Sequence, residues 1–166
     1  ETIELAFYGA SIIHPKTLQP LQKKEIPLHV KSFKNPQSKG TIISKDIDIE
    51  PLVPCYIFKE KLILIKLSSL DFSFMVEDNI SDIFKELHDF KMKVDVIQNS
   101  AISFSVCFFD KYNNIDELVK NLEGKFKIEM YKNVSLFTIR HFNEKSIKKV
   151  SNKRKLVLEQ RTEKTV

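Results

Sequence analysis

The residues suited to bind a small ligand fall in two short segments. Residues 78–81 stand where a helical pattern begins, so we expect backbone N–H groups there that have no acceptor inside the helix and that favour an anion. Asp95, Asn99 and Ser100 belong to the strand and turn expected after that helix. Amides for a carboxylate and an aspartate for an ammonium match the two charged ends of a free amino acid.

An alternative interpretation of the same residues needs no ligand. Asn79 is then only the N-cap of the helix, Asp95 is an exposed strand residue, and Asn99 with Ser100 forms an ordinary hairpin turn. Residue types alone favour this alternative, because each of the three features is common in proteins that bind nothing at these positions.

The usual catalytic and metal-binding motifs are missing from the sequence. Only three glycines occur in 166 residues, and neither GxGxxG nor GxxxxGK[ST] is present to bring backbone against phosphate. The four histidines are far apart and have no cysteine or carboxylate at ligand spacing, so we expect no metal site. Neither GxSxG nor HExxH occurs. We therefore do not expect a self-sufficient nucleotide enzyme, and we assign no catalytic residue.

The compartment is predicted from cysteine usage and hydropathy. Cys55 and Cys107 are too few for a disulfide framework and are expected to be reduced thiols. No apolar stretch approaches the roughly 18 residues of a membrane span, and no signal peptide opens the chain. These observations predict a soluble, cytoplasmic protein without a membrane partner.

The positive charge is concentrated near the end of the sequence. The formal net charge is +5, and residues 145–166 carry eight basic and two acidic residues. A basic tail can bind phosphate backbones, but this one has no aromatic residue to stack on bases and no recognised nucleic-acid motif. We expect the solvated face of a folded region, with a nucleic-acid or membrane contact as the less favoured alternative.

The elements that must position the candidate residues follow one another in the order βαββαβ. Strands are expected at 62–67, 94–96, 102–108 and 126–130. Helical spacing of apolar residues predicts one helix before Val94, with Asp78 or Asn79 as N-cap, and a second that Asn114 caps and Gly124 ends. This order predicts an α+β fold of the ferredoxin-like type.

A second, partial unit of the same plan is expected after the first. Its strand is predicted at 134–140, its helix at 144–150 and its next strand at 156–159. It lacks a last helix and strand, so it needs a strand from elsewhere, and the extended stretch 53–59 is the expected donor. Residues 1–44 contain a helical opening, a helix that begins near Pro15, a short helix bounded by Pro20 and Pro27, a strand at 28–33 and an Asn35-Pro36 turn.

The opening segment resembles the final part of the catalytic domain of aspartate kinases. Residues 4–15 read ELA-x-x-GA-x-x-x-HP and are followed by IPL-x-V at 26–30, NP at 35–36 and GT at 40–41. The remainder resembles the tandem ACT regulatory units of the same enzymes, including VD-x-I-x-x-S at 94–100. The resemblance covers essentially the whole chain.

The resemblance implies a domain organisation. Residues 1–44 would be the tail of an α/β amino-acid-kinase domain, and residues 60–132 would form the first ACT domain. Residues 45–59 together with 133–166 would form a second, truncated ACT domain into which the first is inserted.

The resemblance also implies a function. Aspartate kinases phosphorylate the side-chain carboxylate of aspartate with Mg-ATP, and their ACT units bind an end-product amino acid and pair across a dimer. The chain would then be a regulatory region that binds lysine, or alternatively threonine, as a homodimer and transmits feedback inhibition. The catalytic lysine and glycine segment of the family is absent here, so this chain is expected to be inactive alone and to hold no cofactor, while Mg-ATP is implied for the parent enzyme.

The family motif assigns individual residues to the effector site. Asp95 would hold an effector ammonium, and the amides around Asn79, Ile80 and Ser81 would take the carboxylate. The pocket would be lined by Val94, Gln98, Asn99 and Ser100. The family often has a glycine just before this helix, whereas this chain has Asn79 preceded by two acids, which repel a carboxylate. That departure supports a second interpretation, a structural dimerisation module without an effector.

Overall fold

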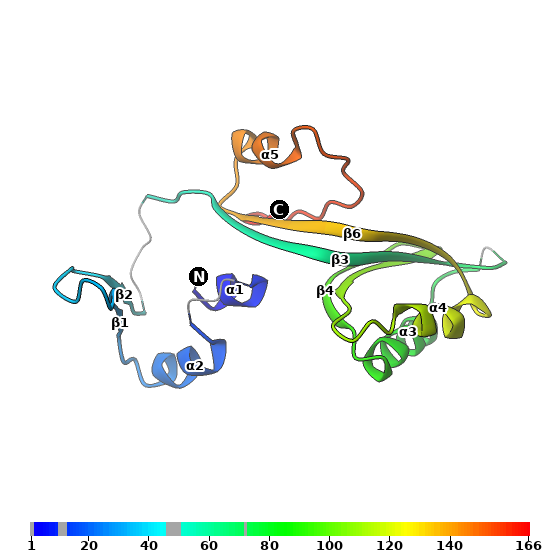
Figure 1. Cartoon of the computed structure of the whole chain (residues 1–166), viewed down its shortest axis with the longest axis horizontal. Coiled ribbons are helices and arrows are strands. Elements are labelled where there is room, and N and C mark those ends of the chain that lie inside the picture. Colours follow the sequence, from blue (N-terminus) through cyan, green and yellow to red (C-terminus); the bar gives the residue numbers. More distant parts are fainter. Residues whose placement is uncertain (1, 10–12, 46–50, 72) are drawn as a thin grey trace. The chain divides into compact units, whose positions relative to one another are not determined.

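The computed structural model describes residues 2–9, 13–45, 51–71 and 73–166, and Figure 1 shows the arrangement of its elements. The chain forms two compact units. The middle unit is Phe58–Leu136, and the terminal unit combines Glu1–Ile57 with Phe137–Val166. Residues 10–12 of the kinase-like segment and 46–50 of the expected second ACT domain lie outside the described residues.

The sheet of the middle unit has the strand order β4-β5-β3-β6. These strands span Cys55–Ser69 (β3), Lys93–Asn99 (β4), Ser103–Phe109 (β5) and Phe126–Arg140 (β6). Strand β5 pairs antiparallel with both β4 and β3, with Ile65 opposite Val106 and Ile97 opposite Val106 on its other side. With α3 (Glu77–Asp89) and α4 (Ile115–Glu123), the chain order is βαββαβ, so the expected α+β fold with an antiparallel, ferredoxin-like sheet is confirmed.

The two helices of the middle unit lie together on one side of the sheet (Figure 1). Alternate residues of the strands point toward them, because successive side chains of a strand face opposite ways. Burial of such side chains is the main stabilising contribution, at about 1.5–3 kcal/mol for each large apolar residue. The fully buried members of this core include Ile65, Leu67, Ile83, Leu87, Phe104, Val106, Phe108, Leu118 and Leu122.

The start of α3 differs from the sequence prediction, whereas α4 starts after Asn114 as expected and differs only in the side chain that caps it. Helix α3 begins at Glu77 with Val76 as N-cap, and Asn79 is its third residue, whose Oδ1 accepts from the N–H of Val76 at 3.1 Å. Asn114 is the N-cap of α4, but its side chain donates to the carbonyl of Phe90 at 3.2 Å instead of capping. The Asp110 carboxylate accepts from the amides of Asn114 and Ile115 in its place, because a charged acceptor binds these N–H groups more strongly than an amide.

The terminal unit contains short elements. They are α1 (Thr2–Tyr8), α2 (Pro15–Lys23), α5 (Glu144–Ser151) and a small sheet in which β1 (Leu28–Val30) pairs antiparallel with β2 (Thr41–Ile43). The expected helix start at Pro15 is confirmed, with the ring of His14 accepting from the amide of Lys16. The prediction of a separate helix bounded by Pro20 and Pro27 is wrong, because Pro20 lies inside α2, which ends at Lys23.

Three strand predictions also need correction. The segments expected at 126–130 and 134–140 are one continuous strand, β6, and the stretch 53–59 continues into 62–67 as β3. No strand forms at 156–159, where Leu156 is exposed. The last residues instead pair with the end of β6: Ile139 donates to the carbonyl of Val166 at 2.6 Å and His141 to that of Lys164 at 2.7 Å. These backbone bonds satisfy the end of β6 and leave 156–159 without a partner strand.

Candidate functional site

The start of α3 and the turn between β4 and β5 lie side by side in the middle unit. The backbone N–H of Met75, one residue before the N-cap, donates to the carbonyl of Ala101 in that turn at 2.8 Å. The N–H groups of the first turn of α3 have no acceptor inside the helix, and they carry the positive end of its dipole. The structure therefore brings two of the predicted segments, 79–81 and 99–100, to one end of the sheet.

The predicted residues on α3 differ in what they can offer to a ligand. The Asn79 side chain is turned back to the amide of Val76, and the N–H of Ile80 already donates to the Val76 carbonyl at 3.2 Å. Ser81 is exposed. Only the amides of the first three residues, Glu77, Asp78 and Asn79, therefore remain for an anion, and two of these three residues are acids.

The predicted residues of the turn are exposed, and hydrogen bonds within the turn hold its backbone in place. Ser100 donates its backbone N–H to the carbonyl of Ser103 at 2.8 Å, and the two hydroxyl groups are 2.8 Å apart. Asn99 stands opposite Phe104 at the end of the strand pairing, and Gln98 stands opposite Ser105. The turn thus has a fixed shape, and the Gln98 and Asn99 side chains are exposed beside it.

Asp95 occupies a β-bulge in β4. Val94 pairs with Phe108 and Val96 with Cys107, so two partners on β5 face three residues on β4 and Asp95 is the extra one. A bulge interrupts the ladder locally and redirects a side chain. Val94 packs against the core under the helices.

The Asp95 carboxylate is buried and paired with a lysine of the same unit. Lys59 Nζ on β3 lies 2.5 Å from Asp95 Oδ1, and the side chains of Lys59 and Asp95 are 24% and 6% exposed. Asp95 is thus not the exposed strand residue of the alternative interpretation. Because both side chains have little contact with solvent, the lysine compensates the charge of a carboxylate whose burial alone would strongly destabilise the fold.

The neighbouring thiol shows on which side of the sheet this pair lies. Burial, and to a smaller extent the negative charge of Asp95, raise the pKa of Cys107 to about 11, while the positive charge of Lys59 opposes the rise. Val106 and Phe108, on either side of Cys107, belong to the core under the helices, so Cys107 faces the other way. We conclude that Asp95 and Lys59 lie with Cys107 on the sheet face that α3 and α4 do not cover.

Within a single copy of the middle unit, the predicted site residues are therefore separated into two groups: Asp95 on the uncovered sheet face, and the start of α3 with the β4–β5 turn. Across the described residues, the Asp95 side chain makes its hydrogen bond to Lys59, and none joins it to the first turn of α3. Sequence reasoning missed Lys59, which fell in the stretch expected to serve the other unit. The sequence did offer one indication that Lys59 is partly buried: it stands two residues after Ile57, so the two side chains share one face of the strand, and Ile57 is buried.

Exposed apolar side chains surround the end of the sheet where α3 begins. Phe74 is 72% exposed, and Val76, Ile97 and Ile102 are also exposed. Strand β4 is an edge of the sheet, so its outer backbone groups have no strand partner within this sheet. We call Phe74, Val76, Ile97 and Ile102 the edge patch.

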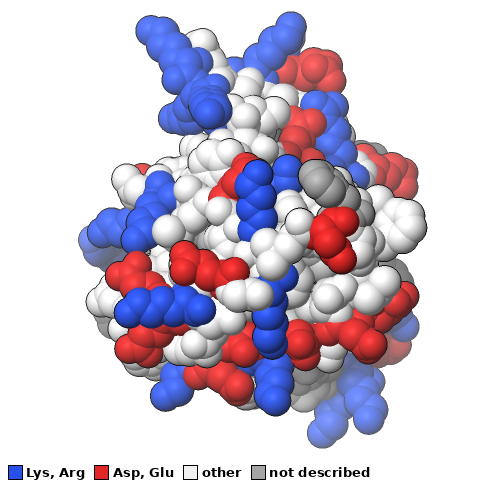
Figure 2. Space-filling model, turned by 90° about the vertical axis from the view of Figure 1, so that its right-hand side faces the viewer, with Lys and Arg blue, Asp and Glu red and all other residues white. Residues whose placement is uncertain are grey.

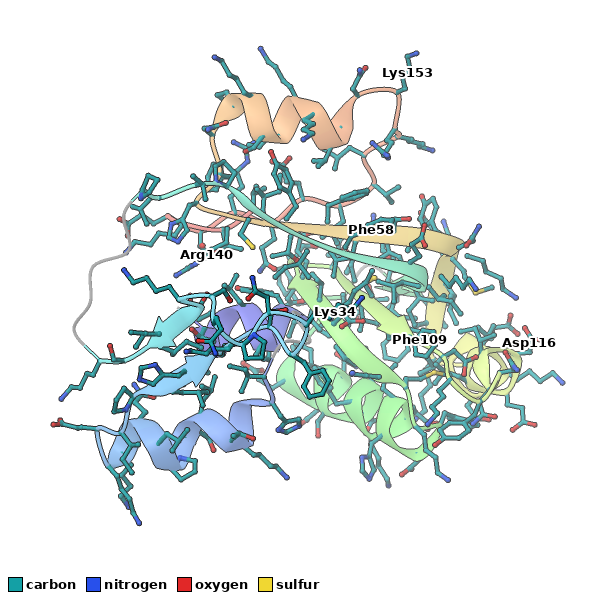
Figure 3. All side chains as sticks on the ribbon, turned by 60° about the vertical axis from the view of Figure 1, so that its left-hand side comes forward. Lys34, Phe58, Phe109, Asp116, Arg140 and Lys153 are labelled. Carbon is teal, nitrogen blue, oxygen red and sulfur yellow. The ribbon has the colours of Figure 1, made fainter. Side chains whose placement is uncertain are left out.

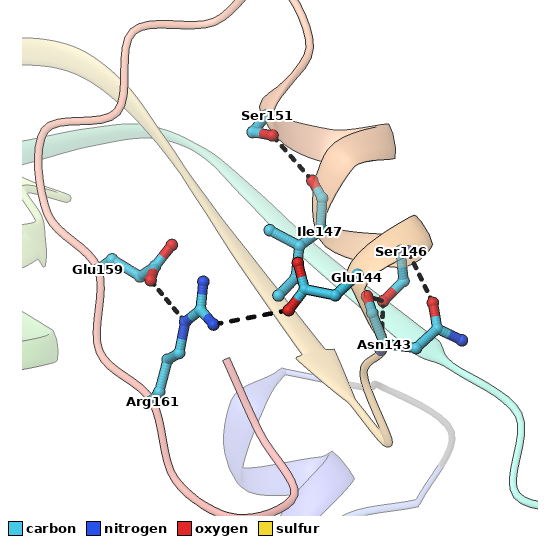
Figure 4. A network of polar contacts seen from close by, with 7 residues as sticks. All are labelled: Asn143, Glu144, Ser146, Ile147, Ser151, Glu159 and Arg161. Atoms are coloured by element: carbon cyan, nitrogen blue, oxygen red, sulfur yellow. Dashed lines mark hydrogen bonds and ion pairs between the residues drawn. The ribbon is translucent and has the colours of Figure 1, made fainter.

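Three cations of the basic tail contact groups of their own unit. Arg161 Nε lies 2.6 Å from Glu159 Oε1, and Arg161 Nη1 lies 4.0 Å from Glu144 Oε1 (Figure 4). The hydrogen bond to Glu159 raises the pKa of Arg161. Lys149 and Arg154 lie over the rings of Tyr56 and Phe137. These contacts favour the expected solvated face of a folded region over a nucleic-acid site.

Other features of the surface give no further site. Acidic and basic side chains are intermixed over most of the face drawn in Figure 2. Arg140, labelled in Figure 3, pairs with Glu4 and donates to the Thr165 hydroxyl at 2.9 Å inside the terminal unit. Within the described ranges, no three His, Cys, Asp or Glu side chains are grouped to hold a metal ion. The helices in those ranges are all too short or too polar to cross a membrane.

Comparison with curated proteins relates the sequence to aspartokinases. The chain is 25% identical over 154 residues to the chloroplastic aspartokinase 2 of Arabidopsis thaliana, which covers 84% of this chain and 27% of that protein. It is 30% identical over 108 residues to the lysine-sensitive aspartokinase 3 of Escherichia coli, covering 64% of this chain and 23% of that one. The chain thus spans about a quarter of the length of these relatives. No family model matches it.

Solved structures share the fold. Aspartokinase III of E. coli in complex with lysine and aspartate superimposes with a TM-score of 0.74 at 19% identity, over 98% of this chain and 39% of that one. The aspartate kinase of Clostridium acetobutylicum gives a TM-score of 0.72 at 18% identity, over 84% of this chain and 34% of that one. The resemblance to aspartate kinases that the sequence motifs indicated is confirmed by these relatives and by this shared fold.

Proposed function

Because the chain is related in sequence and in fold to aspartokinases, we propose that it is the regulatory region of such an enzyme and that it binds an end-product amino acid. Lysine is the effector that we propose, with threonine as the alternative. Binding would favour one dimer arrangement over another and so inhibit phosphorylation of aspartate. Coupling of this kind is typically worth about 1–3 kcal/mol.

The observation that carries this proposal is the match to aspartokinases over most of the chain. One relative is a lysine-sensitive aspartokinase, and a fold neighbour that covers 98% of this chain was solved with lysine and aspartate bound. The geometry supports the same class of ligand. The first turn of α3 offers amides to a carboxylate, and Asp95 is a buried carboxylate suited to an ammonium.

A second copy of the chain would complete the site. In one copy, Asp95 lies on the sheet face away from α3, so its carboxylate and the first-turn amides do not converge. Pairing along the edge patch would bring Asp95 of one copy near the α3 start of another. It would also cover Phe74, Val76, Ile97 and Ile102, which are large apolar side chains left in water. We therefore propose a homodimer through the middle units.

We assign phosphate transfer to the parent enzyme and not to this chain. Mg-ATP chemistry needs a glycine-rich phosphate loop and carboxylates that hold the metal, whereas the sequence has three glycines and no three His, Cys, Asp or Glu side chains of the described residues are grouped to hold a metal ion. The residues present do not fit that cofactor. We propose the domain boundaries given by the family resemblance: 1–44 as the kinase tail, 60–132 as the first ACT domain, and 45–59 with 133–166 as the second.

Isothermal titration calorimetry with lysine, threonine and methionine tests the proposal. We expect saturable heat with lysine, and Asp95→Asn should weaken binding at least tenfold because a neutral amide attracts an ammonium far less than a carboxylate. Asp116→Asn is the matched control, because Asp116 is an exposed carboxylate on α4 of the same unit and should leave affinity unchanged. Absence of heat with all three amino acids would reject the sensing role.

A structural dimerisation module without an effector is the second candidate. Two observations favour it: Glu77 and Asp78 occupy the first turn of α3, and Asp95 is already neutralised by Lys59. A ligand that binds only the folded state must raise the melting temperature. A dimer whose melting temperature is the same with each of the three amino acids would support this second candidate.

A further inference from the structure

Lys59 presents to Asp95 the same chemistry that an amino-acid effector would bring. Its ammonium group lies 2.5 Å from the carboxylate, in a place where the aspartate is 6% exposed. Both residues belong to the middle unit, and the charges of both act on the pKa of the buried Cys107. The position assigned to an effector ammonium is therefore occupied by a group of the chain itself.

We propose that Lys59 is an internal competitor of the effector: its ammonium occupies the Asp95 carboxylate when no effector is bound, and an effector ammonium must displace it. This inference rests on the proposed function and adds a residue that sets effector affinity. Lys59 is not a ligand of the effector in this scheme. It determines how much of the attraction of Asp95 is left for one.

The burial of the pair explains why a competitor is needed. A buried carboxylate without a partner loses its hydration and gains nothing in return, so a site with Asp95 alone would destabilise the effector-free chain. Lys59 removes that cost while the site is empty. An effector then gains only the difference between its own bond to Asp95 and the bond that Lys59 loses, which lowers its affinity.

The Lys59 ammonium can move from the Asp95 carboxylate into solvent. It is 24% exposed, so its head group has a route to water, whereas the aspartate is almost fully enclosed. Lysine carries a compact, strongly hydrated charge on a flexible four-carbon stem, so its head can move into solvent while the stem stays in place. An arginine would hold the carboxylate through two parallel bonds and would be harder to displace.

The experiment is a lysine titration of the 166-residue chain and of three variants. Lys59→Met removes the ammonium but keeps an unbranched side chain, and Lys59→Gln keeps a neutral donor for Asp95. Lys66→Met is the matched control, because Lys66 is a partly buried lysine on the same strand and is not paired with Asp95. We expect lysine to bind Lys59→Met roughly tenfold to a hundredfold more tightly than wild type, as expected when one charge-assisted bond no longer competes.

Lys59→Gln should give an intermediate gain in affinity for lysine, and Lys66→Met should bind lysine as tightly as wild type does. Thermal melting accompanies each titration because Asp95 is left unpaired in Lys59→Met. That variant should melt lower than wild type without lysine and should be raised more by lysine than wild type is. If Lys59→Met fails to fold even with lysine, Lys59→Gln decides the question.

The outcomes separate this inference from the proposed function. If wild type binds lysine and both Lys59 variants bind it equally or more weakly, Lys59 is not a competitor, while the sensing role stands. If neither wild type nor any Lys59 variant binds an amino acid, the sensing role itself is rejected, and the competitor with it.

Discussion

Two ion pairs of almost equal length stand in very different surroundings. Lys59 and Asp95 in the middle unit are 2.5 Å apart, and Arg161 and Glu159 in the terminal unit are 2.6 Å apart. The first pair has side chains that are 24% and 6% exposed, against 46% and 31% for the second. Distance alone would rank the two pairs as equals.

Burial determines what each pair does. Exposed pairs contribute about 0–1 kcal/mol, because water solvates the separated ions nearly as well as they solvate each other. Removing one partner of a buried pair costs about 3–5 kcal/mol, because the other charge is left without compensation. We infer that the Lys59–Asp95 pair governs stability and ligand affinity in the middle unit, and that the Arg161 network contributes little to either.

The largest expected effect is loss of the partner of the buried carboxylate. Lys59→Met leaves the Asp95 carboxylate, which is 6% exposed, without its ammonium, and we expect unfolding in urea to show a loss of about 3 kcal/mol. The double variant Lys59→Met with Asp95→Leu should recover most of that loss, because apolar side chains of similar volume suit a buried site. A loss below about 1 kcal/mol in Lys59→Met would mean that this pair behaves like an exposed one.

A smaller effect is expected from alkaline pH at the neighbouring thiol. The pKa of Cys107 is raised from 9.0 to about 11 in the folded chain, so the unfolded chain releases this proton first as pH rises. The contribution to stability is therefore complete below pH 9 and declines until about pH 11. Urea midpoints measured across this range should fall with pH.

The control for this pH effect is the other cysteine. Cys107→Ala should remove the part of the decline that this thiol causes, whereas Cys55→Ala should keep it, because Cys55 is less buried than Cys107. Equal declines in wild type and Cys107→Ala would show that this thiol does not titrate as the geometry requires.

The smallest expected effect is in the tail network. Arg161→Met breaks the contacts to Glu159 and Glu144, and we expect the free energy of unfolding to change by less than about 1 kcal/mol. Chemical denaturation of wild type and variant in the same buffer measures the difference. A loss comparable to that of Lys59→Met would show that the exposed pair and the buried pair contribute alike to stability.

Local signals in the sequence predicted the order of the elements in the middle unit. Alternating apolar residues marked β5, and helical spacing of Ile83 and Leu87 marked α3, because both periods follow from which side chains face the core. Helix starts were less predictable. Asn114 is the N-cap of α4 as expected, but the carboxylate of Asp110, four residues earlier, accepts from the amides at the start of α4 in place of the Asn114 side chain, and that depends on how the loop folds back.

The candidate site was predictable only where it is local. The start of α3 and the turn with Asn99 and Ser100 were found from short segments, and the structure places them side by side through Met75 and Ala101. The partner of Asp95 was not found, because Lys59 is 36 residues away and meets it only through the pairing of β3 with β5 and of β5 with β4. Such a pairing is a property of the assembled sheet.

A crystal structure of the chain grown with saturating lysine would show whether an effector ammonium replaces Lys59 at the Asp95 carboxylate. We predict an ammonium group of the ligand at hydrogen-bond distance from Asp95, about 2.7–2.9 Å, with Lys59 Nζ moved away into solvent. The ligand carboxylate should lie at the first-turn amides of an α3 helix. A lysine bound elsewhere, or no bound lysine with Lys59 still on Asp95, would contradict the account.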